Sequence, residues 1–204
     1  QPGELGFLFI AQVIQRAAIS GADILTNAQK ARVLGLEFEG LLMPTKWLTL
    51  SGVYSYNSAK YLTYNTIAIP AIPGISVAQP SPDLAGTPFS FVPEHKFSLD
   101  ARVGLPIDAK MGDLGITANW SYQSSQRVTP EEMPFDTVAA FSLVNLRVDW
   151  RDVGGMPFDV SVYSTNIFNT EYRVAANPGY NISGFINSIY GEPAQYGVQL
   201  RYRF

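Results

Sequence analysis

The sequence contains no cysteine and only one histidine among its 204 residues. The absence of cysteine excludes disulfides, thiolate metal sites and cysteine nucleophiles. Charged residues are also scarce, at 15%, whereas a soluble domain carries roughly 25%. The formal net charge is -3 and no basic stripe is present, so we expect no nucleic-acid partner.

The chain also lacks any stretch that could form a transmembrane helix. Its longest uncharged run, 61–82, includes Pro70, Pro73, Pro80 and Pro82, which would break a helix. The sequence starts at Gln1 with neither an initiator Met nor a signal peptide. We therefore expect a processed chain or a piece of a longer one.

Aromatic residues, in contrast, are plentiful at 13%, and the last ten residues show what they belong to. Residues 195–204 alternate with a period of two, which predicts a β-strand. One face carries Tyr196, Val198, Leu200, Tyr202 and Phe204, and the other carries Gly197, Gln199, Arg201 and Arg203. A soluble sheet would turn the apolar row toward a core, whereas a membrane barrel turns it toward lipid.

The same alternation recurs along the chain and predicts eight strands of roughly ten residues, a length that suits tilted membrane strands. The connections between them alternate between long and short, with short ones at 44–46, 106–113 and 151–157. Outer-membrane barrels show this asymmetry, with short periplasmic turns and longer external loops. The expected strands lie near 5–15, 30–43, 47–57, 95–105, 114–123, 141–151, 158–168 and 195–204.

The two faces of these strands lead to further expectations. Aromatic side chains gather near the strand ends and would form two interfacial girdles, one with Trp47, Trp150, Phe158, Tyr202 and Phe204 and the other with Tyr54, Tyr56, Trp120 and Tyr122. The polar rows would face a hydrated lumen, because unpaired charges cannot line a dry core. The expected lumen-facing side chains are Glu37, Glu39, Asp100, Arg102, Asn119, Arg147, Asp149 and Arg201.

A soluble β-sandwich or a lipocalin-like barrel is the alternative, since these folds alternate as well. Strand lengths near ten, rather than five or six, count against it. So do the charged rows and the alternating loop lengths.

No motif indicates an enzyme, a cofactor or a metal site. His95 lies near Ser98 and Asp100, but residue 95 has the opposite strand parity, so the three should not converge as a triad. Glu37 and Glu39 could suggest a carboxylate pair, yet two acids on one strand face more often line water. We therefore expect no catalytic, cofactor-binding or metal-binding residues.

Several segments, in this order, resemble the C-terminal part of the β-barrel of TonB-dependent outer-membrane receptors. The pieces are Lys30 to Glu39, Leu48 to Tyr61, Val92-Pro93-Glu94-His95, Ser121 to Ser124, Leu143 to Leu146, Asn166-Ile167-Phe168-Asn169 with Tyr172, and Tyr196 to Phe204. Together they cover nearly the whole chain. One departure is Ala194 after Pro193, where the family often has Arg.

The resemblance implies an all-β, antiparallel transmembrane barrel of about twenty-two strands, of which 1–204 would supply the last eight. It implies energy-coupled uptake of a scarce ligand, such as a ferric siderophore, across the outer membrane of a Gram-negative bacterium. The expected partners are outer-membrane lipid, the remaining strands, a plug domain absent from this chain, a periplasmic TonB-type energy coupler and the barrel-assembly machinery. Phe204 is similar to the terminal signal that this machinery reads.

The ligand itself is not named by the sequence. Loops 58–94 and 169–194 would face the exterior and help to bind it, with Tyr61, Tyr64, Tyr180 and Tyr190 as possible contacts. The alternative function is a self-contained eight-stranded barrel with a structural, adhesive or lipid-modifying role. Pairing of 5–15 with 195–204 would close that narrow barrel, whereas an open edge would favour the larger receptor.

Overall fold

The computed structural model describes residues 13–19, 22–28, 30–64, 83–130, 136–177 and 187–204. It is built of antiparallel strands, with two single-turn 3₁₀ segments, η1 (Ala109–Met111) and η2 (Val153–Gly155). In the described residues no helix is long and apolar enough to cross a bilayer.

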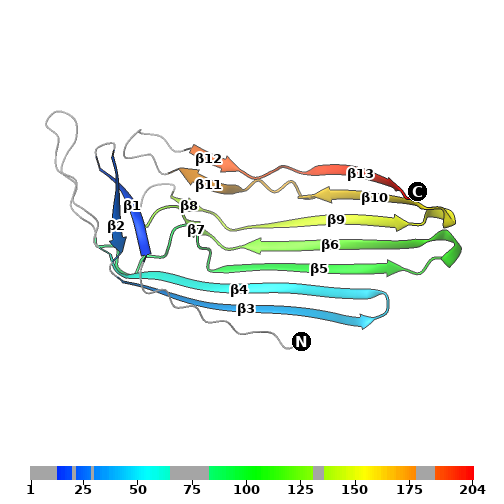
Figure 1. The fold of residues 1–204 in the computed structure, drawn as a ribbon, viewed down its shortest axis with the longest axis horizontal. Helices are drawn as coiled ribbons and strands as arrows, with labels where there is room; N and C mark the ends of the chain where they lie inside the picture. Colours follow the sequence, from blue (N-terminus) through cyan, green and yellow to red (C-terminus); the bar gives the residue numbers. More distant parts are fainter. Residues whose placement is uncertain (1–12, 20–21, 29, 65–82, 131–135, 178–186) are drawn as a thin grey trace.

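A seven-stranded antiparallel sheet forms the body of the structure (Figure 1). Its order is β13-β10-β9-β6-β5-β4-β3, so each strand lies beside its neighbour in the sequence of main strands. The strands are β3 (Lys30–Thr45), β4 (Leu48–Thr63), β5 (His95–Leu105), β6 (Asp113–Gln123), β9 (Phe141–Arg151), β10 (Phe158–Thr165) and β13 (Gln195–Tyr202).

Short two-stranded sheets lie at the end where the long loops are (Figure 1). They pair β1 (Val13–Ile19) with β2 (Ala22–Ala28), β7 (Gln126–Arg127) with β8 (Thr137–Val138), and β11 (Arg173–Asn177) with β12 (Asn187–Tyr190). The short turns and the C-terminus lie at the opposite end, which agrees with the predicted asymmetry.

The observed bounds refine the sequence prediction. β5 and β9 span 95–105 and 141–151, the same ranges as two of the predicted strands. β4 runs on to Thr63 because it stays paired with β3, where Lys30 lies opposite Thr63. On its other side the chain returns beside it, with Tyr61 N donating to Thr87 O at 3.0 Å and Phe89 N to Ala59 O at 3.0 Å. β10 ends at Thr165, earlier than predicted, because Asn166 takes a left-handed conformation with φ 47°.

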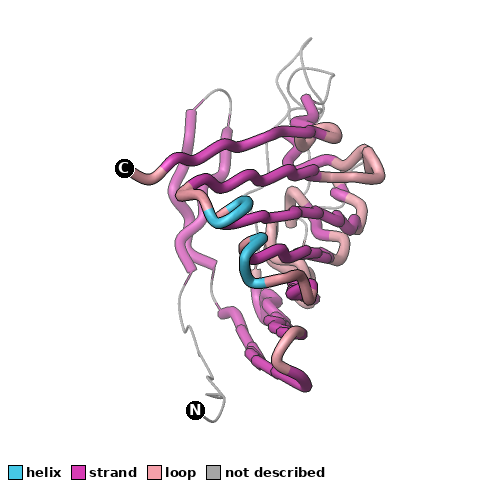
Figure 2. Tube along the Cα trace, turned by 90° about the vertical axis from the view of Figure 1, so that its right-hand side faces the viewer, coloured by secondary structure: helices cyan, strands magenta, loops and turns pink. Residues whose placement is uncertain are grey.

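Of the predicted first strand 5–15, all but the last three residues lie outside the described part of the chain. Residues 13–15 begin β1, which pairs with β2. Among the described strands, β13 pairs with β10 and β3 with β4, so the main sheet is open at both edges. In Figure 2, which looks from the end that carries the short turns, this sheet curves without closing.

In the described residues, no second layer of side chains packs over the apolar face of the main sheet, as it would in a soluble β-protein. Leu99, Trp120, Val162 and Leu200 point from that face and remain 45–64% exposed. Burying one such side chain in an apolar medium stabilises by about 1.5–3 kcal/mol. An eleven-residue strand is roughly 36 Å long, enough to cross an apolar band about 25 Å tall when tilted. The face therefore has the chemistry and the height of a lipid-contacting surface.

The two clusters of buried apolar side chains found in the described residues lie among the long loops. Tyr61, Tyr64 and Leu84 form one, with Ala31 and Phe89 packed against it. The other consists of Val128, Val138 and Ala176. The loop end is thus folded by its own small cores, because the sheet itself offers none.

Candidate functional site

The polar face of the sheet and the loop structure above it form the candidate site. Cross-strand pairing places the predicted polar residues on one face, because Asp100 pairs with Asn119, Arg102 with Thr117, and Thr117 with Arg147. Glu37 belongs to the same face, since its partner Ser55 also pairs with Lys96. Period-two alternation carried through an unbroken register produces this result.

A chain of amide side chains crosses this face. Asn119 Nδ2 donates to Ser98 Oγ and to Asp100 Oδ1, both at 3.0 Å. Asn145 Nδ2 then donates to Asn119 Oδ1 at 3.1 Å, and Asn145 Oδ1 accepts from the backbone N–H of Asn166 at 2.9 Å. We call these five residues, Ser98, Asp100, Asn119, Asn145 and Asn166, the amide ladder.

A charged cluster lies beside the ladder on strands β9, β10 and β13. Arg147 Nε is 2.7 Å from Asp149 Oδ1, and Ser161 Oγ donates to the same oxygen at 2.6 Å. Arg147 also donates to Gln199 Oε1 at 3.1 Å. Asp149 is only 14% exposed, so its charge is matched by two donors where water is scarce.

A second charged cluster lies at the short-turn end. Arg203 contacts the carboxylates of Asp152 and Asp159, the latter at 2.8 Å. Asp159 Oδ1 also accepts from the N–H of Asp152 at 3.0 Å. We call this group the terminal clasp, because it ties the C-terminal strand to the turn between β9 and β10. From the sequence, Arg201 and Arg203 were both assigned to the polar face of 195–204, but only Arg201 was included among the lumen-facing candidates.

The tyrosines predicted as ligand contacts are placed very differently from one another. Tyr61 is fully buried and Tyr64 is 4% exposed, with their ring centroids 4.8 Å apart, so both serve the loop core. Tyr190 is 55% exposed on β12. Tyr180 lies outside the described residues. Of the three that the structure describes, only Tyr190 has an exposed side chain.

Burial also affects the chemistry of Tyr61, which lies beyond the part of β4 that pairs with β5. Removal from water raises the pKa of its phenol to about 12, and the neighbouring Tyr64 adds to the effect because two phenolates would repel each other. The phenol stays neutral, and the cluster behaves as an apolar core at physiological pH.

The β11–β12 hairpin is attached to the sheet by two left-handed asparagines, Asn166 and Asn169. The Asn166 side chain, 4% exposed, accepts from Thr170 N at 2.8 Å and donates to the carbonyls of Thr170 and Glu192 at 2.9 and 3.1 Å. Asn169 Oδ1 accepts from Ala194 N at 2.9 Å. The two residues thus fasten both ends of the segment 170–194.

Sequence reasoning had included Asn119 but had missed Asn145 and Asn166 as functional candidates. The available signal was the Asn-Ile-Phe-Asn motif at 166–169, which was noted only for its resemblance. Its physical role is local, because asparagine tolerates φ near +50° and its amide can bond backbone groups nearby.

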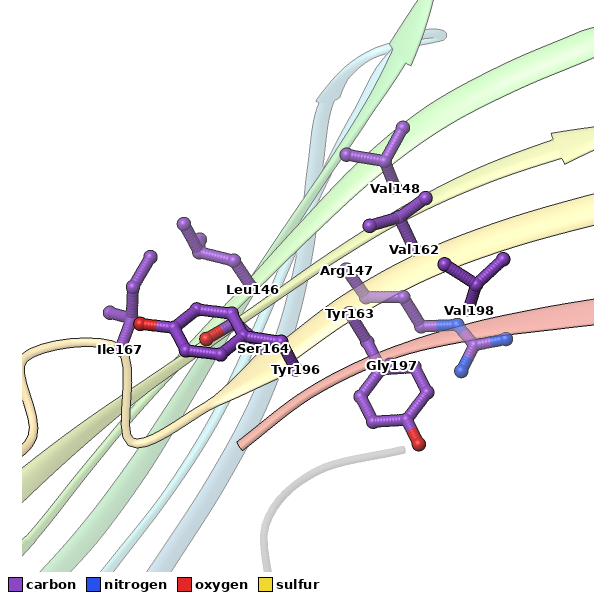
Figure 3. A pocket seen from close by; sticks show the side chains of 10 residues that line it. All are labelled: Leu146, Arg147, Val148, Val162, Tyr163, Ser164, Ile167, Tyr196, Gly197 and Val198. Carbon is purple, nitrogen blue, oxygen red and sulfur yellow. The ribbon is translucent and has the colours of Figure 1, made fainter. Parts of the chain in front are cut away.

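An apolar groove of about 550 Å³ lies over strands β9, β10 and β13 (Figure 3). It forms where the small Ser164 pairs with the larger Leu146 and Tyr196 on either side. Val148, Val162 and Val198 continue the lining. These side chains belong to the apolar face, and Arg147 and Tyr163 of the opposite face complete the lining.

In the described residues no cluster of three or more His, Asp or Glu side chains could hold a metal ion. His95 instead contacts aromatic side chains, with Tyr54 Oη 2.9 Å from His95 Nδ1 and the Tyr56 ring centroid 5.2 Å from its own. It pairs with Tyr56 on the apolar face, away from Ser98 and Asp100. These contacts indicate that His95 packs among aromatic side chains.

Comparison with known proteins agrees with this architecture. The family model described as TonB dependent receptor-like, beta-barrel matches residues 9–169. No sequence among curated proteins matches the chain.

Solved structures share the fold at low sequence identity. The ferric yersiniabactin uptake receptor FyuA from Yersinia pestis aligns over 89% of this chain with a TM-score of 0.67 and 15% identity. The siderophore receptor PiuA from Acinetobacter baumannii aligns over 93%, with a TM-score of 0.64 and 14% identity. The copper transporter OprC aligns over 96%, with a TM-score of 0.59 and 12% identity.

This chain covers 25%, 24% and 27% of those three proteins, and hence about a quarter of their length. The proteins that it resembles are receptors and transporters rather than enzymes. The family match, which spans more than half of the chain, shows that it belongs to the TonB-dependent receptor β-barrel family.

Proposed function

We propose that this chain is the C-terminal barrel portion of an outer-membrane receptor that imports a scarce ligand, such as a ferric siderophore, with energy supplied from the inner membrane. The proposal is supported above all by the open, curved sheet with one apolar face and one hydrogen-bonded polar face. Such a sheet needs further strands to close around a wet interior, as a large barrel would provide.

In this proposal the polar face lines the lumen, where a plug domain supplied by the rest of the receptor would sit. Energy would reach that plug through a periplasmic TonB-type coupler. The apolar face contacts outer-membrane lipid in a Gram-negative bacterium. Phe204, whose side chain is fully exposed, follows β13 and belongs to the signal that the barrel-assembly machinery would recognise.

The ligand would be bound at the loop end, above the polar face. Tyr190 is our proposed contact, because it is exposed on a hairpin whose ends are fixed to the sheet. A fixed aromatic side chain provides contact area at low entropic cost. The structural relatives named above act on ferric yersiniabactin, a siderophore and copper, so the fold leaves the ligand class open.

The test uses the complete receptor expressed in a Gram-negative strain that lacks its own ferric siderophore receptors. Uptake would be measured with radiolabelled iron in catecholate, hydroxamate, phenolate and citrate complexes, and separately with labelled copper and cobalamin. We expect one of these to accumulate and an inner-membrane uncoupler to abolish its uptake. Accumulation unaffected by the uncoupler, or none with any ligand, would contradict the proposal.

Tyr190 can be tested within the same assay. Tyr190→Ala should weaken binding of the identified ligand by about tenfold or more, because it removes an exposed aromatic contact. Tyr61→Phe is the matched control, since Tyr61 is fully buried and its ring would be kept. Equal binding by both variants would withdraw Tyr190 from the site.

A further inference from the structure

The amide ladder joins two parts of the molecule that the proposed function treats separately. At one end it lies on strands β5 and β6, within the polar wall. At the other it ends at Asn166, whose side chain holds both ends of the segment that contains the β11–β12 hairpin. Asn145 on β9 joins the two by side-chain hydrogen bonds.

We propose that Asn145 is a positioning residue for the β11–β12 hairpin, acting through the backbone of Asn166. Asn145 has no contact with the hairpin itself. Its Oδ1 accepts from the Asn166 N–H at 2.9 Å, while its Nδ2 is held by Asn119 Oδ1 at 3.1 Å, so the acceptor is fixed in direction by the strand beside it.

The position of Asn166 matters because its conformation leaves few alternatives. Its φ of 47° is unusual for a residue with a side chain, and the residue is 4% exposed. Its N–H therefore needs a protein partner, and a buried N–H that loses one shifts the local opening equilibrium by about tenfold or more. The neighbouring Ile167 N donates to Val144 O at 2.9 Å, so the turn is pinned to β9 at two successive residues.

Other contacts also hold the hairpin. Arg173 donates to the Thr137 carbonyl at 2.6 Å, and Ala176 packs with Val128 and Val138, so these contacts join one loop to another. Tyr172, just before β11, packs against Phe141 of β9 with ring centroids 4.5 Å apart. Asn145 differs from these contacts because it connects the loop end to the hydrogen-bonded polar wall that a lumenal domain would touch, and linkage makes any such coupling reciprocal.

The inference rests on the proposed function only in taking the hairpin to be on the ligand side. Its test therefore uses no ligand. In the complete receptor, paired spin labels would be placed at Tyr190→Cys on the hairpin and Val148→Cys on the apolar face of β9. The 204 residues contain no cysteine, so these thiols would be the only ones in this region. The distance distribution between the labels reports the hairpin's position.

Two replacements of Asn145 separate its hydrogen bond from its volume. Asn145→Leu has a similar size but no acceptor, and we expect the label distribution to broaden about twofold or to shift. Asn145→Gln keeps an amide that has both the acceptor for the Asn166 N–H and the donor for Asn119 Oδ1, and we expect a distribution closer to the parent's. Gln123→Ala, a polar-face amide outside the ladder, is the matched control and should leave the distribution unchanged.

A parent-like distribution in Asn145→Leu, or equal broadening in Asn145→Gln and Asn145→Leu, would overturn the inference. If Asn145→Leu does not yield folded receptor, Asn145→Ser, which shortens the acceptor, replaces it, and hydrogen exchange of the peptide 166–172 gives a second readout. Faster exchange there supports the inference, and unchanged exchange rejects it. Because no ligand is used, a negative uptake result would withdraw the proposed function without affecting this outcome.

Discussion

At the scale of single residues, backbone geometry at the turns and burial in the loop clusters govern the expected behaviour. Gly112 has φ 98°, a conformation that other residues rarely adopt. Tyr61, in contrast, is an ordinary residue in an unusual place, because a phenol is enclosed at the loop end of a membrane-type sheet. Each of these two residues leads to a specific prediction.

Gly112→Ala should destabilise the receptor by about 2–4 kcal/mol, because its new Cβ would collide with the carbonyl oxygens of Arg151 and Asp152 at a strained φ. Thermal unfolding in detergent, followed by circular dichroism, measures the change. Gly40→Ala is the control, since its Cβ would meet the Phe38 ring at an ordinary 3.5 Å. An equally stable Gly112→Ala would show that the turn can relax.

Tyr61 should make the loop end sensitive to alkali. Its pKa is raised from 10.0 to about 12, so the folded state favours the neutral phenol. The stability that this provides is complete below pH about 10 and is lost between pH about 10 and 12, as the unfolded state ionises first. Absorbance at 295 nm would follow the phenolates. Tyr61→Phe should remove a late-titrating group from this curve, and a curve unchanged by the substitution would contradict the prediction.

At the scale of elements, strand ends are fixed by side chains that bond the backbone or one another. The terminal clasp shows this at β13, where Arg203 contacts Asp152 and Asp159 and its N–H donates to Pro157 O at 2.9 Å. Asn166 has a similar role at the C-terminal end of β10, where its side chain bonds the backbone of Thr170. Regular pairing ends where these contacts begin.

Arg203→Gln should loosen the end of β13 and lower the free energy of unfolding by about 0.5–1 kcal/mol, since both partners of this half-exposed ion pair keep access to water. High salt should shrink the difference from the parent. Arg201→Gln, on the same strand face but outside the clasp, is the control. An Arg203→Gln variant that is as stable as the parent would show that the clasp adds nothing.

At the scale of the whole molecule, the open edges of the main sheet decide how the chain behaves on its own. Among the described strands, β3 and β13 each pair with one strand only, so the backbone N–H and C=O groups along their outer edges have no partner strand. An edge of this kind promotes aggregation unless it is paired with another strand or covered.

We expect residues 1–204, refolded alone in detergent, to give heterogeneous β-rich assemblies, whereas the complete receptor gives one monomeric species. Size-exclusion chromatography with light scattering would distinguish them. A monodisperse fragment, with cysteines placed in 5–15 and 195–204 forming a disulfide across the seam, would instead support the self-contained eight-stranded barrel.

Much of this molecule could be predicted from sequence because strand periodicity is local. Alternation in 95–105 and 141–151 fixed both the bounds and the faces of β5 and β9, and the loop lengths indicated which ends lie together. The hydrogen bond between Asn145 and Asn166 could not be found that way. It depends on the left-handed conformation of Asn166, which follows β10 and directs its N–H toward the neighbouring strand β9.

By itself, then, the sequence determined an antiparallel sheet with one apolar and one polar face, because alternation acts residue by residue along each strand. Only the tertiary structure decided which of the tyrosines are buried and which polar residues bond one another. Tyr61 and Tyr190 both lie in segments that the sequence predicts as long loops, yet the first is buried in a cluster and the second is exposed. That difference arises from where the loops fold back, which depends on contacts between residues distant in sequence.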